Sequence, residues 1–253
     1  MSTLQPCRHI VLTGGASAIG SVLASRLAAD PLNNLIVTTK HSHIEGQWAT
    51  LPNVVHLSDM DLTSQSCLDK LRHMVSEQTC GPLAMIHCVG SFWHHTPLVE
   101  CPQAVGRLMM ESHYLTLYGV SHALLPIMIQ RGGGRIVAFS CSSVSYNYPD
   151  MAPFTCAKAA VECLVRCIAN EYSRFNISAN AVALSTVHTP EVIRTKPNGD
   201  HDNYMTRDEV SDLAIQLLLE VSPFINGTCI RLIKHSSSFY HQSYYQRNPT
   251  GSS

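Results

Sequence analysis

The chain has 253 residues, of which 45% are hydrophobic and 14% charged, and its formal net charge is −1. These proportions fit one large globular α/β domain and exclude a disordered chain. Because no basic block is present, the chain has no electrostatic basis for binding nucleic acid or an anionic membrane surface.

The sequence also indicates the kind of compartment in which the protein resides. No run is long and apolar enough to cross a bilayer, and no leader peptide is visible before the first glycine turn. The ten cysteines include no C-x-x-C pair. We therefore expect buried free thiols and no disulfide framework. The resulting prediction is a cytoplasmic protein that spans no membrane and holds no metal.

Short apolar runs alternate with longer amphipathic stretches along the chain. The predicted strands are 9–13, 35–39, 54–61, 83–90, 135–140, 178–184 and 228–235. The predicted helices are 18–29, 62–78, 101–130, 153–174 and 205–221. Nearly continuous apolar strands that alternate with helices are typical of a parallel sheet covered on both faces. The predicted fold is α/β: a Rossmann-like, doubly wound parallel sheet in a three-layer α/β/α arrangement.

The strand and helix pattern continues without a domain boundary or an internal repeat. Residues 1–235 are therefore expected to form a single domain, and residues 236–253 form a polar, tyrosine-rich tail. Such a tail is either a disordered end or an arm that docks on a partner chain.

The first strand runs into the sequence TGGASAIG, which leads into the first helix. A tight turn of this kind directs backbone N–H groups and the helix dipole toward one spot, which suits a pyrophosphate. The sequence resembles the T-G-x-x-x-G-x-G turn of the short-chain dehydrogenase/reductase family, with an alanine in place of the middle glycine. The resemblance implies that the turn contacts the cofactor through Thr13, Gly14, Ala18, Ile19 and Gly20.

The end of the second strand bears on the choice of cofactor. It has no acidic residue for a ribose 2′-hydroxyl, and Lys40 is placed to meet a 2′-phosphate, which favours NADP(H) over NAD(H). Lys40 is alternatively a solvated loop lysine. The resemblance further implies that Asp61, in the family's D-L-T element, contacts adenine. Gly90 and Thr189, which follow the fourth and sixth strands, are implied to line the cofactor as well.

The resemblance extends from about residue 8 to 235 and implies hydride transfer between a nicotinamide and a carbonyl or alcohol. In that family a tyrosine exchanges the proton, a lysine four residues later holds the nicotinamide ribose, and a serine and an asparagine assist. Lys158 matches the lysine by spacing, but the other positions hold Phe154, Cys141 and His113. A phenyl ring cannot exchange a proton, and losing a general acid–base group costs about 10²–10⁴-fold in rate.

Other side chains are candidates to replace the missing groups. His113 is one possible proton donor, although a histidine within an apolar helix is more often a core residue. Tyr146 and Tyr148 lie between Cys141 and Phe154 and are also candidates, although loop tyrosines more often serve packing. If the strand end is shifted by one residue, the serine role falls to a neighbour of Cys141. Those neighbours are Ser140 and Ser142.

The leading hypothesis is a degenerate family member that serves as a non-catalytic or cofactor-binding subunit. It pairs with itself as a homodimer or homotetramer, or with an active relative in a hetero-oligomer. The expected seam is the helix stripe of Ala157, Ala160, Leu164, Cys167 and Ile168. The alternatives are an atypical NADP(H)-dependent carbonyl reductase and a dinucleotide sensor.

Two groups of residues support opposite expectations for the strength of cofactor binding. The retained Gly14, Gly20 and Lys158 favour binding, whereas Ala18 and the altered N-N-A-G element at 87–90 favour a weakened or empty site.

Overall fold

The computed structural model describes residues 8–41, 46–78, 81–93, 96–219 and 225–233. Its strands form one parallel sheet in the order β3-β2-β1-β4-β5-β6-β7. The strands are β1 Arg8–Thr13, β2 Asn33–Thr38, β3 Val54–Leu57, β4 Leu83–His87, β5 Gly134–Cys141, β6 Ile177–Leu184 and β7 Cys229–Leu232. This is the predicted doubly wound α/β fold, and the fold class is confirmed.

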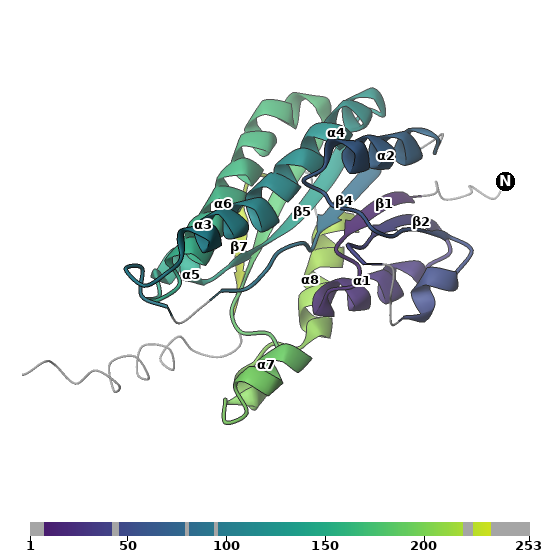
Figure 1. Ribbon diagram of the computed structural model, residues 1–253. Helices are drawn as coiled ribbons and strands as arrows, with labels where there is room; N and C mark the ends of the chain where they lie inside the picture. The colour runs from purple at the N-terminus through teal and green to yellow at the C-terminus, as the bar shows by residue number, and fades with distance from the viewer. Residues whose placement is uncertain (1–7, 42–45, 79–80, 94–95, 220–224, 234–253) are drawn as a thin grey trace, which may run out of the picture.

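The helices cover both faces of the sheet (Figure 1). The α-helices are α1 Ala18–Ala28, α2 Gln65–Ser76, α3 Gln103–Met109, α4 Thr116–Gln130, α5 Ser143–Tyr146, α6 Ala152–Tyr172, α7 Pro190–Thr195 and α8 Arg207–Leu219. A π-helical segment, η2 (Met110–Leu115), joins α3 to α4, and short 3₁₀ turns are η1 Gln47–Thr50, η3 Ser173–Phe175 and η4 His201–Asn203. Helices α2, α4 and α6 pack on one face, and α1 and α8 on the other.

Two hydrophobic cores lie on the two faces of the sheet because successive residues of a strand point to opposite sides. In β1, Val11 belongs to the core under α2, α4 and α6, whereas Ile10 and Leu12 belong to the core under α1 and α8. All three side chains are at most 1% exposed. Burial on both faces explains why the strands are continuous apolar runs.

Several predicted boundaries were wrong, each for a local reason. The third strand ends at Leu57 and not at 61, since Asp59 has a left-handed backbone with φ of 57°. The second predicted helix begins at Gln65, because the segment from Asp61 forms a turn first. The helix predicted to end at residue 174 ends at Tyr172 and continues as a 3₁₀ turn. The last strand spans Cys229–Leu232, and residues 234–253, including the predicted tail, lie outside the described residues.

The predicted single helix 101–130 is interrupted where it carries His113. Residues Met110–Leu115 form a π-helical segment between α3 and α4. Such wide turns occur mostly as single bulges within α-helices, often at functional sites. His113 lies within this π-helical segment and is buried, with 2% of the residue exposed.

The predicted seam on α6 was wrong as a single exposed face. Ala157 and Ile168 are 0% and 3% exposed and pack inside the subunit. Leu164 is partly buried against the same core, and Cys167 is exposed. The stripe therefore winds from the interior to the surface and does not define one contact face.

The prediction of buried thiols was also wrong for the described cysteines. Cys156, Cys163 and Cys167 are exposed on α6, and the remaining described cysteines are half-buried. All are free thiols, as expected.

Within the described residues, no helix has the length and apolar character needed to cross a membrane. The same part of the chain contains no cluster of three or more histidine, cysteine or acidic side chains suited to a metal ion.

Candidate active site

The candidate site lies at the carboxyl edge of the sheet, where β1, β4 and β5 end at Thr13, His87 and Cys141. Parallel strands bring these ends to one edge, and ligands of doubly wound sheets bind there, at the point where the strand order reverses. That point lies between β1 and β4, whose paired residues include Thr13 and His87. Strand topology therefore places the glycine turn beside the predicted chemical groups.

The glycine turn is closed by contacts that leave no room for side chains at two of its glycines. Gly14 has a φ of +76°, and a Cβ there would lie 2.6 Å from the Cys88 carbonyl oxygen. A Cβ on Gly20 would lie 2.2 Å from the Gly14 carbonyl oxygen. Both positions require glycine, and the turn thereby brings its backbone close to the end of β4.

The first turn of α1 presents free backbone N–H groups beside the glycine turn. Ser17 caps the helix, and its hydroxyl oxygen accepts from the Gly20 N–H at 3.0 Å. Ala18 and Ile19 follow within the first turn, where N–H groups have no partner inside a helix. These donors and the positive end of the helix dipole fit the pyrophosphate of a dinucleotide.

Lys40 and Asp61 lie near each other after β2 and β3. Lys40 is exposed. The Asp61 carboxylate accepts from the Thr63 hydroxyl at 2.7 Å and from the Thr63 backbone N–H at 3.0 Å. These bonds stabilise the turn that precedes α2. The Thr63 bonds, with a smaller effect from Lys40, lower the pKa of Asp61. Lys40 thus has an accessible ammonium at the carboxyl end of β2, the edge of the sheet that also carries the glycine turn.

Phe154 occupies the centre of an aromatic cluster. Its ring stands edge-to-face with Phe92 at 5.1 Å and with His113 at 5.3 Å between centroids. Trp93 and Cys141 pack against the same small core. Phe154 is 6% exposed, so the position aligned with the family's tyrosine is held by packing and contains no exchangeable proton. Sequence reasoning missed Phe92, whose only signal is its place just after the fourth strand.

Lys158 lies one helical turn after Phe154. Its Nζ atom is 5.8 Å from the Phe154 ring centroid and donates to the Phe139 carbonyl oxygen at 2.8 Å. Burial lowers the pKa of this lysine to about 8, although the thiols of Cys141 and Cys88 act in the opposite direction. Lys158 as a whole residue is 8% exposed.

His113 is a neutral imidazole whose one N–H group is engaged in a hydrogen bond. Its Nε2 lies 2.7 Å from the Ser91 carbonyl oxygen, and because a carbonyl only accepts, Nε2 carries the hydrogen. Its Nδ1 has no hydrogen-bond partner and faces Gly90, where a Cβ would lie 2.2 Å away. Burial, with a smaller effect from Lys158, lowers the pKa of His113 to about 3.

A buried hydrogen-bond chain joins the glycine turn to the helix after His113. His87 Nδ1 lies 2.8 Å from the Thr13 hydroxyl, and Nε2 lies 3.2 Å from the Thr116 hydroxyl. Because Thr116 donates to the Ser112 carbonyl, it accepts from Nε2–H, and Thr13 donates to Nδ1. Burial lowers the pKa of His87 to about 3. Sequence reasoning identified His87 only as an altered position in the N-N-A-G element and missed Thr116.

Of the two serine neighbours of Cys141, Ser140 is engaged elsewhere. It donates to the Glu162 carboxylate at 2.6 Å, whereas Ser142 is buried and 3% exposed. Cys141 itself is half-buried, and its sulfur accepts from the Ser143 N–H at 3.5 Å. The proposed shift by one residue was therefore wrong for Ser140.

The remaining candidates sit at the rim of the site. Tyr146 and Tyr148 stack on each other, with centroids 5.7 Å apart and planes at 19°. Thr189 caps α7 by accepting from the Val192 N–H at 3.2 Å. The Thr189 hydroxyl therefore acts as the N-cap of α7, the helix that follows β6.

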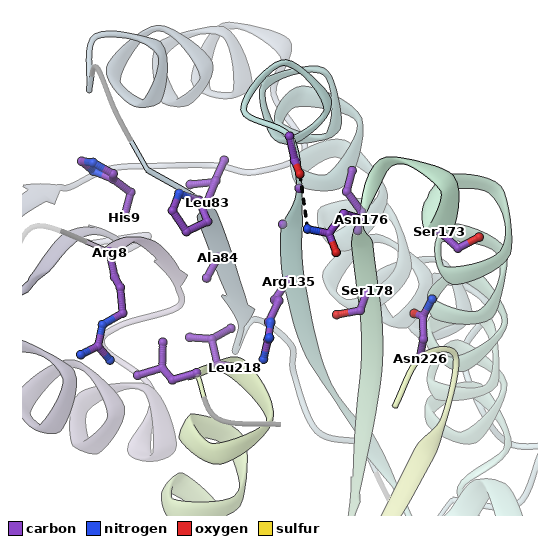
Figure 2. A pocket seen from close by; sticks show the side chains of 16 residues that line it. Arg8, His9, Leu83, Ala84, Arg135, Ser173, Asn176, Ser178, Leu218 and Asn226 are labelled. Carbon is purple, nitrogen blue, oxygen red and sulfur yellow. Dashed lines mark hydrogen bonds between the residues drawn. The ribbon is translucent and has the colours of Figure 1, made fainter. Parts of the chain in front are cut away.

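The cavity in Figure 2 lies at the opposite edge of the sheet from these groups. It has a volume of about 430 Å³ and is lined by residues at the amino ends of the strands, among them Arg8, Leu83, Arg135 and Ser178. Its position excludes it as the cleft beside the glycine turn.

A doubly wound parallel sheet whose first strand leads through a glycine turn into a capped helix defines a protein of the Rossmann-type α/β fold. The family model described as short chain dehydrogenase matches residues 8–198. The chain belongs to this family.

Two relatives illustrate the range of the family. The chain is 26% identical over 195 residues to the 2,3-dihydroxy-2,3-dihydro-p-cumate dehydrogenase of Pseudomonas putida, covering 74% of this chain and 73% of the relative. It is 24% identical over 194 residues to the fatty acyl-CoA reductase of Acinetobacter baylyi, covering 74% of this chain but only 64% of that longer protein.

Solved structures share the fold at low identity. ElxO with NADP bound superposes with a TM-score of 0.79 at 20% identity, covering 88% of this chain and 96% of ElxO. A tyrosine-to-phenylalanine variant of ElxO with NADPH bound gives the same values.

Proposed function

We propose that this protein is an NADP(H)-binding member of the family that has lost the ordinary tyrosine-dependent reaction. It would act as a cofactor-binding or non-catalytic subunit of a homo-oligomer, or of a hetero-oligomer with an active relative. The observation that carries the proposal is the buried phenyl ring of Phe154, which sits 5.8 Å from Lys158 where the family places its phenol.

The residues at the carboxyl edge fit a dinucleotide. The close approach at Gly14 and Gly20 and the free amides of Ala18 and Ile19 suit its pyrophosphate. Lys40 is accessible for a 2′-phosphate, which supports NADP(H). When bound, such a cofactor supplies or accepts a hydride. The ElxO variant offers a parallel, because a tyrosine-to-phenylalanine change there is compatible with bound NADPH.

The engaged or weak proton donors next to Phe154 support loss of the ordinary reaction. His113 has its one N–H committed to the Ser91 carbonyl, and both ring nitrogens of His87 are hydrogen-bonded. Cys141 is a weak donor. Reduction of a carbonyl needs a proton on its oxygen, so these groups favour binding over turnover.

The second candidate is an atypical NADP(H)-dependent carbonyl reductase with a substitute donor. Of its two proposed donors, His113 is disfavoured by its bond to Ser91. Tyr148 is favoured by its place in the segment between Cys141 and Phe154, where it is held against Tyr146. This candidate predicts NADPH oxidation that disappears in Tyr148→Phe.

Subunit pairing is supported by apolar side chains on the outer side of the long helix that carries His113. Leu108, Leu115 and Tyr118 are 47%, 42% and 48% exposed. Large apolar side chains exposed along successive segments are typical of a surface that packs against another chain.

The proposal is tested by titrating the purified protein with NADPH and NADH and following nicotinamide fluorescence. Micromolar NADPH binding without turnover on a carbonyl panel is the expected result. Turnover abolished by Tyr148→Phe would establish the second candidate. No binding at millimolar cofactor would refute both and leave the fold as an assembly scaffold.

A further inference from the structure

Lys158 carries a buried amine with an unusual set of partners. The residue is 8% exposed, and its Nζ atom donates to one protein acceptor, the neutral carbonyl of Phe139. Among the described residues it takes part in no ion pair with a carboxylate. The nearest acid along α6, Glu162, is occupied by Ser140 and Arg166. A buried ammonium without a carboxylate is destabilised, and its pKa is lowered as a result.

The groups that face this amine do not stabilise its charge strongly. His113 and His87 are neutral, because burial lowers the pKa of each to about 3. Burial likewise raises the pKa of the Cys88 thiol and keeps it protonated. Cys141, at the end of β5, completes the set. The pKa of Lys158 accordingly falls to about 8, which raises the share of neutral amine near neutral pH.

The neighbourhood of the amine also suits an apolar organic group. The Phe154 ring is 5.8 Å from Nζ, and Phe92 stacks edge-to-face on Phe154 while remaining 50% exposed. Trp93 packs on the same cluster, and its buried Nε1–H has no hydrogen-bond partner. Aromatic carbon, one unpaired donor and the amine therefore lie in one cluster that reaches the surface at Phe92.

We propose that Lys158 captures a small apolar aldehyde or ketone as a Schiff base. The neutral nitrogen attacks the carbonyl carbon to give a carbinolamine, which loses water to give a carbon–nitrogen double bond. The carbonyl oxygen leaves with the two amine hydrogens, so no oxidant or reductant is consumed. Lysines whose pKa is lowered by apolar surroundings are suited to this chemistry, because more of the nucleophilic neutral amine is present near neutral pH. The step needs neither the missing phenol nor a dinucleotide, so it goes beyond the proposed function.

The test is reductive trapping of the full chain without added cofactor. The protein is incubated with benzaldehyde and sodium cyanoborohydride between pH 6.5 and 9, and the modified lysines are located by peptide mass spectrometry. The exposed lysines Lys40 and Lys70 serve as internal controls. We expect Lys158 to be benzylated at least tenfold faster than either at pH 7.5. Its rate should rise with pH and level off above about 8, because protonation of the amine blocks attack.

Two variants separate the site from general reactivity. Lys158→Arg keeps a positive charge but cannot form the imine, so its loss of the fast adduct supports the inference. Cys156→Ser, which removes an exposed thiol of α6 outside the site, should retain the adduct, because a thiol adduct is not fixed by the reductant. Labelling of Lys158 no faster than that of Lys40 and Lys70 would overturn the inference. Since no dinucleotide is present, this failure is distinct from a failure to bind NADPH.

Discussion

The imidazole of His113 stands nearly perpendicular to the ring of Phe154, with centroids 5.3 Å apart and planes at 80°. Both residues occupy positions at which the family resemblance implies polar groups. Their contact shows that the two replacements pack against each other. The site is therefore packed through aromatic contacts. Because the two rings touch, a substitution at either His113 or Phe154 also alters the surroundings of the other.

Replacing Phe154 by tyrosine tests how much of the reactive geometry is retained. Lys158 lies 5.8 Å from the ring and can lower the pKa of a phenol introduced there. We expect Phe154→Tyr to gain NADPH-dependent ketone reduction of at least about 10²-fold over the parent protein. Activity is measured from NADPH absorbance, with Phe154→Leu as the control that lacks a hydroxyl. A silent variant that still binds NADPH would show that Cys141 and His113 must be reverted as well.

Lys40 tests the choice of cofactor. If its exposed ammonium meets a 2′-phosphate, Lys40→Ala should weaken NADPH binding about tenfold, about 1.4 kcal/mol, and leave NADH binding unchanged. The effect should shrink at high salt, because exposed charges are screened. Lys70→Ala is the matched control, since Lys70 is an exposed lysine on α2. Equal losses for both dinucleotides would assign Lys40 to the solvated loop.

Acid should destabilise the fold through its buried histidines. The pKa of His113 falls from 6.5 to about 3 on folding. Between these two pH values the unfolded chain binds a proton at His113, whereas the native protein does not. The stabilisation is complete above pH 6.5 and is lost as pH falls toward 3. At pH 5 the loss is about 2 kcal/mol for this residue.

Urea unfolding at pH 7.5 and pH 5 checks this expectation. His113→Asn should reduce the difference between the two free energies of unfolding by about 2 kcal/mol, whatever it does to stability at pH 7.5. His122→Asn, at an exposed position of α4, should leave the difference unchanged. An unaltered difference in His113→Asn would mean that the imidazole is protonated in the native state.

The glycine turn should be intolerant of a single methyl group. Gly20→Ala places a Cβ 2.2 Å from the Gly14 carbonyl, and we expect a loss of roughly 1–3 kcal/mol together with weaker NADPH binding. Gly106→Ala is the matched control, because no atom lies within 4 Å of its Cβ position on α3. It should stabilise the protein by about 0.5–1 kcal/mol. Similar thermal unfolding of the two variants would contradict the proposed crowding at Gly20.

The fold was predictable because burial on both faces leaves a continuous apolar signature in each strand. The positions aligned with the family's reactive groups were predictable from spacing, and Phe154, Lys158, Cys141 and His113 do lie close together. Their contacts were not predictable. The π-helical segment that buries His113 depends on backbone packing and has no local sequence signal.

The same limit applies to contacts between distant segments. The bond from His87 to Thr116 joins residues that only the tertiary fold brings together. The pairing of Ser140 with Glu162 likewise depends on the docking of α6 onto β5. Periodicity reports which face is buried, but it does not report what a buried polar atom meets.

The interior position of β1 in the sheet has a consequence for how the chain folds during synthesis. Arg8–Thr13 pairs on one side with β2, but its other edge is completed only by β4, whose His87 lies 74 residues after Thr13. A nascent chain leaving the ribosome therefore carries an apolar strand with an open edge until β4 emerges. Open strand edges invite pairing with other chains. A chaperone that covers this strand edge during early synthesis would prevent such pairing.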